Sequence, residues 1–515
     1  MTAFERFISA TTPSRTTAKA ALGTNFDLLR AGGLIVLLPS ALFAKELGPI
    51  PAVSVLVGCL LVAAILLRAA ARPESLLAKP IDLKMFAGCG AAALALCALG
   101  GEGRIFFANY DWLIRDAVLA DLVKHETINV YGFDNHTYFL RAPFGMYLAP
   151  AMVGRAFGLI AAHWALLVQN ASVLGVVLYF VAALTPRFRV AAVAVFVLFS
   201  GVDILPTLIL NAEQIWRTGH FTFERQLDWW NGDIQYSSHL TQLFWTPNHM
   251  LPAWWFAALA LLYARREVGF ALLVASFAPL LFWSPLAMLG ALPFLLLFWG
   301  EEPRSLLAPD GLAALVSGAA FLPIALFLTV ASGDIPHEFL LWRKSFWLLW
   351  PIFLAVEIPH TAILALRWRL IEECDRRIIL VAIASLVLIP IYSMGENDDF
   401  AMRVSSLPMF LLAFAFTRVA VLTPRDGGRM ATTISCLVII SATTPGFELR
   451  RAFVPASPIS DCNFMTAWKE SEAPFPYHYL APREAAPAWL NASTAAPLEI
   501  EQKTCRLDRA SSPQQ

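Results

Sequence analysis

Three separate stretches of the chain combine carboxylates, cations and aromatic side chains at spacings that suit chemistry. The first stretch runs from Asn109 to Asp116 and continues through Asp121, Lys124 and His125. If it is helical, Asp111 and Arg115 are four residues apart and share a face. A carboxylate beside a guanidinium stays ionised and oriented, which suits a general base or a cation ligand. An ordinary salt-bridged surface helix has the same spacing, so both interpretations stay open for this stretch alone.

The second stretch is rich in tryptophan. It contains Trp229, Trp230, His239, Gln242 and the element Trp245-Thr-Pro-Asn248-His249. Tryptophan at a membrane boundary often lies in the lipid interface, and this interpretation also stays open. Indole faces beside Asn, Gln and His equally suit a sugar, because its ring stacks on indole while its hydroxyls form hydrogen bonds. His249 could donate to a phosphate or protonate a leaving group.

The third stretch is Glu396-Asn397-Asp398-Asp399-Phe-Ala-Met-Arg403. Arg403 lies at the predicted outer boundary of the membrane, where positive charge is disfavoured, so it needs an anion. That anion is a carboxylate, from Asp398 or Asp399, or a lipid phosphate. Other cations predicted on the same side offer similar chemistry, with snorkelling as the simpler explanation for the last two: Arg141, Arg343 and Lys344.

The composition places these stretches in a membrane protein. Of 515 residues, 58% are hydrophobic and 15% charged, and the mean hydropathy of +0.62 is too high for a soluble globular chain. The formal net charge of zero gives no basic excess for nucleic acid. The sequence has no phosphate-binding glycine loop, zinc-type Cys or His spacing, or serine nucleophile elbow. Cytoplasmic nucleotide chemistry is therefore disfavoured.

Apolar runs predict an all-α polytopic protein with about thirteen transmembrane helices. The runs are 26–44, 52–68, 85–100, 163–184, 190–208, 251–264, 268–300, 310–331, 346–366, 378–394, 406–422 and 430–446. The run 268–300 is too long for one crossing, so we expect two short helices that meet at Ser284-Pro285. Counting 142–160 as a span would move Arg187 and Arg189 outside, so we expect an interfacial helix there.

Basic residues in the short loops predict the sidedness. They place residues 1–25 in the cytoplasm, and this segment lacks the apolar run of a signal peptide. Residues 26–446 form the transmembrane domain, and residues 447–515 form a small, irregular extracytoplasmic tail. The predicted outer loops are 101–162, 209–250, 332–345 and 395–405. All of the unusual polar residues therefore lie on one side.

Six of the seven cysteines fall into two groups. Cys59, Cys89, Cys97 and Cys436 lie in apolar runs and are expected to be small buried hydrophobic residues. In the predicted outer tail, Cys462 and Cys505 are candidates for a disulfide that closes a loop of about 40 residues. Two free thiols are the alternative.

The three stretches resemble motifs of the GT-C superfamily of membrane glycosyltransferases, and especially its uncharacterised bacterial multi-pass members. The matching elements are Asp111-Trp112 with Arg115, then Trp245-Thr-Pro-Asn248-His249, then Asn397-Asp398-Asp399-Phe-Ala-Met-Arg403. The last has one residue more between Asn and Phe than the family pattern. The resemblance covers roughly residues 100 to 425.

The resemblance implies a GT-C-like fold with an outward active site, a polyprenyl-phosphate-linked sugar as donor, and an aspartate as general base. The catalytic candidates are Asp111 and Asp116. The candidates for binding the donor phosphate are Arg115, Arg141, His249, Lys344 and Arg403. The candidates for binding sugar or acceptor are Trp112, Trp245, Asn248, Asn397, Asp398 and Asp399. Two extra spans precede the catalytic loop, and the two aspartates are five residues apart, so the identity of the base stays open.

The sequence therefore predicts an inverting glycosyltransferase of the bacterial inner membrane that acts on an extracytoplasmic lipid, glycan or protein. Its expected partners are a polyprenyl-phosphate-linked sugar and membrane lipid, without nucleic acid. Dependence on a divalent metal stays open. Two rival hypotheses are a lipid or polysaccharide transporter, which should carry charges at mid-membrane depth, and a non-catalytic subunit of an envelope assembly complex.

Overall fold

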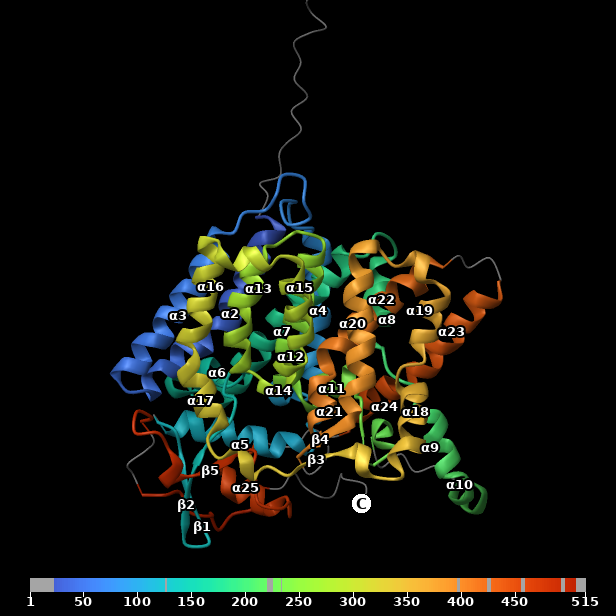
Figure 1. Cartoon of the computed structure of the whole chain (residues 1–515). Coiled ribbons are helices and arrows are strands. Elements are labelled where there is room, and N and C mark those ends of the chain that lie inside the picture. The colour runs from blue at the N-terminus through green and yellow to red at the C-terminus, as the bar shows by residue number, and fades with distance from the viewer. Residues whose placement is uncertain are drawn as a thin grey trace, which may run out of the picture.

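The chain forms a bundle of helices with a cluster of shorter elements at one end. The computed structural model describes residues 23–125, 127–219, 226–232, 234–395, 399–423, 428–454, 459–491 and 496–505. The bundle helices run roughly side by side, and α5, the strands and the C-terminal segment gather at the lower end in Figure 1.

The elements follow one another along the chain as the apolar runs suggest, with many interruptions. The helices up to the middle of the chain are α2 (Asn25–Phe43), α3 (Pro49–Arg68), α4 (Leu83–Leu99), α5 (Asp111–Lys124), α6 (Leu148–Phe157), α7 (Leu159–Ala183), α8 (Arg189–Val197), α9 (Ile204–Leu210), α10 (Ala212–Thr218), α11 (His239–Trp245) and α12 (Pro247–Ala264). The later helices are α13 (Phe270–Leu281), α14 (Pro285–Leu289), α15 (Leu292–Glu301), α16 (Pro309–Ala320), α17 (Leu322–Thr329), α18 (Phe346–Glu357), α19 (His360–Leu366), α20 (Glu373–Leu388), α21 (Asp399–Val404), α22 (Ser406–Leu422), α23 (Arg429–Ser441), α24 (Thr443–Arg451) and α25 (Phe464–Glu470). The strands are β1 (Val130–Phe133), β2 (His136–Leu140), β3 (His337–Phe339), β4 (Tyr392–Met394) and β5 (Leu480–Pro482).

The predicted count of about thirteen spans is wrong for the part of the chain that the structure describes. Five helical segments are long and apolar enough to cross a membrane: Asn25–Glu46, Pro49–Arg68, Leu159–Ala183, Pro309–Thr329 and Arg429–Arg451. The pair α18 and α19, bent by 66°, makes a sixth if it counts as one span. Other apolar helices are only 10 to 17 residues long. A hydropathy count includes apolar residues whether or not they belong to one continuous helix. Several of the predicted runs are divided here into two or more helices.

Two of the predicted runs show how the division arises. The run 190–208 separates into α8 and α9. Between them, Gly201 packs so closely that an added Cβ would lie 2.9 Å from the Val356 carbonyl oxygen, which accepts the Val202 N–H at 2.9 Å. The run 268–300 bends where predicted: α13 ends at Leu281, and the Ser284 hydroxyl accepts the backbone N–H of Ala287 at the start of α14. Each of these two runs is thus divided into shorter helices.

The stretch 142–160 forms a helix separate from the following span, as the charge pattern indicates. Helix α6 ends at Phe157, and Gly158, with φ of 92°, reverses the backbone before α7 starts at Leu159. A positive φ of this size suits glycine because it lacks a Cβ. The position of α6 at a membrane interface stays a prediction.

A small sheet joins the C-terminal segment to the first large loop. Strands β1 and β2 form an antiparallel hairpin, and β5 pairs antiparallel with β2 in the order β1-β2-β5. At the hairpin turn, Asp134 and Asn135 have φ of 47° and 62°, the left-handed conformation that tight hairpin turns require. Strands β3 and β4 form a second pair. The described chain is thus mostly helical, which is compatible with the expected all-α membrane fold, and it carries a few short strands in addition.

The C-terminal segment is more ordered than the irregular cap expected. The predicted disulfide between Cys462 and Cys505 is confirmed, with their Cα atoms 5.8 Å apart. Asp121 of α5 holds this segment in place, since one carboxylate oxygen accepts both the Tyr131 hydroxyl at 2.6 Å and the Phe464 backbone N–H at 2.8 Å. The described part of the tail is therefore a structured part of the lower end of the molecule.

We expect Asp121→Ala to loosen the tail. The substitution leaves the buried Tyr131 hydroxyl and Phe464 N–H without their partner, at a cost of about 1–3 kcal/mol. Limited proteolysis should then cleave the tail faster, and the thermal midpoint should fall. Asp461→Ala is the matched control, because the Asp461 side chain is 65% exposed and its ion pairs are at the surface. Equal protease resistance of the two variants would contradict this role of Asp121.

Candidate functional site

A cavity of about 370 Å³ lies at the lower end of the bundle, where residues from all three sequence stretches meet. Its walls come from α5 (Asp111, Ile114, Arg115), the segment 226–246 (Gln226, Trp229, Gln235, Ser237, Thr241, Trp245, Thr246), α21 (Asp399, Met402, Arg403) and the tail (Trp468, Ser471, Ala473, His478, Tyr479), together with Tyr110. This volume is in the range of small-molecule sites.

One side of the cavity carries two carboxylate–guanidinium pairs. Arg115 donates to Asp111 at 3.3 Å, and Arg403 lies 2.7 Å from Asp399. Both pairs have the four-residue spacing that places partners on one helix face. The Asp111 side chain is 41% exposed whereas that of Arg115 is 6% exposed. The Asp111 carboxylate is therefore accessible from the cavity, and the buried Arg115 guanidinium holds it in place.

Tyr479 and His478 of the tail line the cavity near the two carboxylate–guanidinium pairs. Burial raises the pKa of Tyr479, and the charges that act on it are those of the two pairs, Arg115 with Asp111 and Arg403 with Asp399. Burial, with help from Arg403, lowers the pKa of His478 to about 4, although Asp399 opposes the shift. His478 is therefore neutral near pH 7 and able to accept a hydrogen bond.

The structure separates the two candidate catalytic aspartates. Five residues along a helix rotate a side chain by roughly 140° relative to the first, so Asp116 points away from Asp111. Asp116 is 1% exposed and lies 2.9 Å from Arg104, on the bundle side of α5. It does not line the cavity, so the prediction of Asp116 as an alternative base has no support in the geometry.

Three further candidates are buried beside the cavity without lining it. His249 contacts the Ser284 hydroxyl at 2.6 Å, and Asn248 contacts the other nitrogen of the same ring at 3.1 Å. Trp112 donates its indole N–H to the Phe244 carbonyl at 3.1 Å. These contacts fix α5 and the start of α12, so we correct the predicted ligand roles to structural ones.

The remaining predicted cations also lie elsewhere. Arg141 is buried and donates to the carbonyl oxygens of Leu328 and Tyr477, which holds the tail against the bundle instead of leaving the guanidinium for a phosphate. Lys344 is exposed just before α18 and does not line the cavity. The predicted phosphate-binding roles of both residues are therefore corrected. Asn397 and Asp398 lie outside the described residues.

The tail is what sequence reasoning missed. Trp468, His478 and Tyr479 line the cavity, but they lie in a segment that was expected to be a mere cap. Their one sequence signal is the density of aromatic residues between Trp468 and Tyr479, which is unusual for a surface segment. Without the pairing of β5 with β2, this signal does not indicate which surface those residues face.

A second group of carboxylates lies behind the cavity wall. Asp203, Asp228 and Glu357 are buried, and Asp203 and Glu357 hydrogen-bond to each other. Asp228 accepts the Ser238 N–H at 3.1 Å and bonds to Thr241, which lines the cavity. Burial and the Asp203 charge raise the pKa of Asp228 well above its ordinary value.

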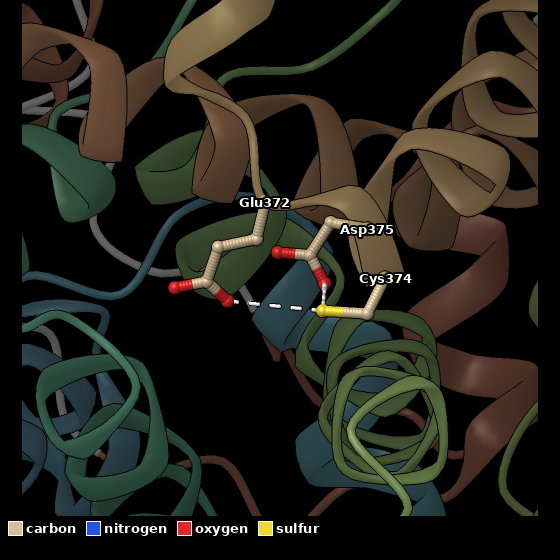
Figure 2. Close-up of side chains that lie close together, drawn as sticks. All are labelled: Glu372, Cys374 and Asp375. Carbon is tan, nitrogen blue, oxygen red and sulfur yellow. Dashed lines mark hydrogen bonds between the residues drawn. The ribbon is translucent and has the colours of Figure 1, made fainter.

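A metal site is not apparent at the cavity among the described residues. One described group, Glu372, Cys374 and Asp375, brings three potential ligand atoms within 4.8 Å of one another at the start of α20 (Figure 2). Arg265 donates to both Asp375 oxygens, each at 2.6 Å, and to Glu372 at 3.0 Å. These carboxylates are thus satisfied by guanidinium, and metal dependence of the protein stays a prediction.

We expect Asp228→Asn to flatten the dependence of stability on pH. Because the pKa of Asp228 is raised on folding, its contribution to stability is full below the ordinary aspartate pKa of about 4 and is lost as pH rises through the raised value. Asparagine has no proton to lose and can still accept from Ser238. The thermal midpoint should fall less between about pH 5 and pH 9 than in the wild type. The exposed Asp310→Asn is the control, and parallel profiles for all three proteins would refute the assignment.

Comparisons of the chain with protein-family models, with curated proteins and with solved structures find no match.

Proposed function

We propose that this protein is an inverting glycosyltransferase that moves a sugar from a polyprenyl-phosphate donor to a hydroxyl group of an extracytoplasmic acceptor. The observation that carries the proposal is the meeting of Asp111, Arg115 and Arg403 in one cavity at the end of an apolar bundle. A donor whose carrier is a lipid reaches such a cavity from the membrane, while its charged and sugar parts need the polar groups found here.

The two guanidinium groups suit the phosphate of the donor. Arg115 has a buried amino nitrogen, and Arg403 a buried ε nitrogen, without a hydrogen-bond partner in the described structure. Guanidinium groups bind phosphate oxygens in a planar, bidentate manner, and such bonds are strong where water is excluded. We infer that the phosphate lies between Arg115 and Arg403.

Asp111 is the proposed general base. Its carboxylate accepts the proton of the acceptor hydroxyl, whose oxygen attacks the anomeric carbon and forms the new glycosidic bond. The bond between that carbon and the phosphate oxygen breaks, and its electron pair leaves with the polyprenyl phosphate. The charge that develops on the phosphate lies beside two cations, so this leaving group needs no strong acid.

We further propose that the cavity faces outward from a bacterial inner membrane, with the N-terminus in the cytoplasm. Helix α12 starts beside the cavity, directly after Thr246, and ends directly before Arg265, and its 18 residues span roughly 27 Å. Arg265 and the nearby Arg418 therefore lie at the far end of the bundle, where basic residues are expected to face the cytoplasm. The disulfide of the tail belongs to the cavity end, which fits an oxidising compartment.

The base assignment is tested by Asp111→Asn in proteoliposomes supplied with synthetic polyprenyl-phosphate sugars and membrane lipids as acceptors. Sugar transfer should fall by on the order of 10²- to 10⁴-fold, because the base is lost with little change in volume. Binding of polyprenyl phosphate should persist. Asp310→Asn, on an exposed helix start far along the chain, is the control. Full transfer by the Asn variant would remove Asp111 from the mechanism, and transport without transfer by the wild type would favour the transporter.

The phosphate assignment is tested by Arg403→Ala and Arg403→Lys. We expect the Ala variant to bind polyprenyl phosphate about ten- to a hundredfold more weakly, since a charge-assisted hydrogen bond is worth roughly 1.5–3 kcal/mol. Lysine should restore part of the affinity because it keeps the charge but not the planar donors. Lys344→Ala is the control, an exposed cation outside the cavity. Unchanged affinity in both Arg403 variants would make Arg403 only the structural partner of Asp399.

A further inference from the structure

The tail contributes its own residues to the cavity lining. Their chemistry differs from that of the charged residues contributed by α5 and α21. The tail residues that line the cavity are Trp468, Ser471, Ala473, His478 and Tyr479. None of these side chains is charged near neutral pH, since burial lowers the pKa of His478 to about 4. The part of the cavity lining that comes from α5 and α21 carries both carboxylate–guanidinium pairs. The cavity is thus divided into a charged side and an uncharged, aromatic side.

The aromatic side is held in a fixed arrangement. Trp468 stacks on Phe464 with ring centroids 5.7 Å apart and planes 25° apart, and its indole N–H donates to the Pro474 carbonyl at 2.8 Å. The centroid of the His478 ring lies 5.5 Å from that of Trp468 and 4.5 Å from that of Tyr479. Each ring is therefore positioned by a neighbour before any ligand arrives, which lowers the entropic cost of binding.

A disulfide joins two positions of the tail that lie before and after these lining residues in the sequence. The disulfide joins Cys462 to Cys505, at a sequence separation of 43, and the tail residues that the described chain contributes to the cavity all lie between them. The enclosed segment is also bound to α5 through Asp121 and to the hairpin through β5. These attachments hold the aromatic tail residues at the cavity that Asp111 also lines.

We propose that the tail residues lining the cavity form the acceptor subsite and that it takes a neutral sugar ring, with Trp468 as the stacking surface and the Tyr479 and His478 side chains as hydrogen-bond partners. This inference rests on the proposed function and names its acceptor class. A sugar offers one apolar ring face and several hydroxyls, which match an indole beside uncharged donors and acceptors. A phosphate or an acidic acceptor would bind the guanidinium side instead.

The test uses the full-length protein in lipid nanodiscs and a panel of methyl glycosides as probes, with binding followed by saturation-transfer difference NMR. Wild type should bind at least one glycoside, and Trp468→Ala should weaken that binding roughly tenfold, as expected for the loss of one aromatic contact. Trp468→Phe should restore part of it. Tyr479→Phe, which removes only a hydroxyl, should weaken binding without changing the thermal midpoint. Trp216→Ala, at an 87% exposed tryptophan on α10, is the control.

A Cys462→Ser, Cys505→Ser double variant should also lose affinity for the glycoside while it still binds polyprenyl phosphate, because Arg115 and Arg403 lie outside the closed segment. Equal glycoside binding in wild type and Trp468→Ala, or binding of a short hydroxyl-bearing peptide in place of every glycoside, would overturn the acceptor subsite and leave the proposed function standing. Glycoside binding through Trp468 in a protein that transfers no sugar would overturn the proposed function alone.

Discussion

The structure depends on ion pairs between deeply placed guanidinium groups and carboxylates. A charge at the edge of an apolar bundle is costly unless an opposite charge and hydrogen bonds compensate it. Arg104 pairs with Asp116 inside the bundle, Arg115 with Asp111 and Arg403 with Asp399 at the cavity, and Arg265 with Asp375 at the far end. The pairs at the cavity differ from the others because a side chain of the pair is open to a ligand.

This difference explains why similar residues have different roles. Asp111 and Asp116 lie on the same helix, and each has an arginine, but the Asp116 side chain is 1% exposed and that of Asp111 is 41% exposed. A buried ion pair fixes α5 against the bundle, whereas a half-exposed carboxylate held by a buried guanidinium can receive a proton from a bound molecule. The first pair thereby positions the second.

The sequence predicts the charged pairs of the cavity better than it predicts the number of membrane spans. The four-residue spacing of Asp111 and Arg115, and of Asp399 and Arg403, gives the two ion pairs because helix geometry is local. The bend at Ser284-Pro285 and the disulfide follow from equally local or pairwise chemistry. Span length fails because the break at Gly201 depends on a close approach to Val356, a contact far away in the sequence.

Contacts between residues far apart in the sequence also explain which site residues sequence reasoning assigned incorrectly or missed. Arg141 looks like any loop cation until the Tyr477 carbonyl, more than 300 residues later, is placed beside it. Trp468, His478 and Tyr479 reach the cavity only because β5 pairs with β2 and Asp121 accepts the Phe464 N–H. Periodicity carries no information on such long-range contacts, so the charged side of the cavity was predictable and the aromatic side was not.

The most direct measurement is a cryo-EM structure of the full-length protein in nanodiscs with polyprenyl monophosphate added. The account predicts phosphate density between the Arg115 and Arg403 guanidinium groups, within hydrogen-bonding distance of both, and the lipid chain leading away along the apolar helices. Phosphate density beside Lys344 or at the Arg265 end, with the cavity unchanged, would contradict the claim that this cavity is the donor site.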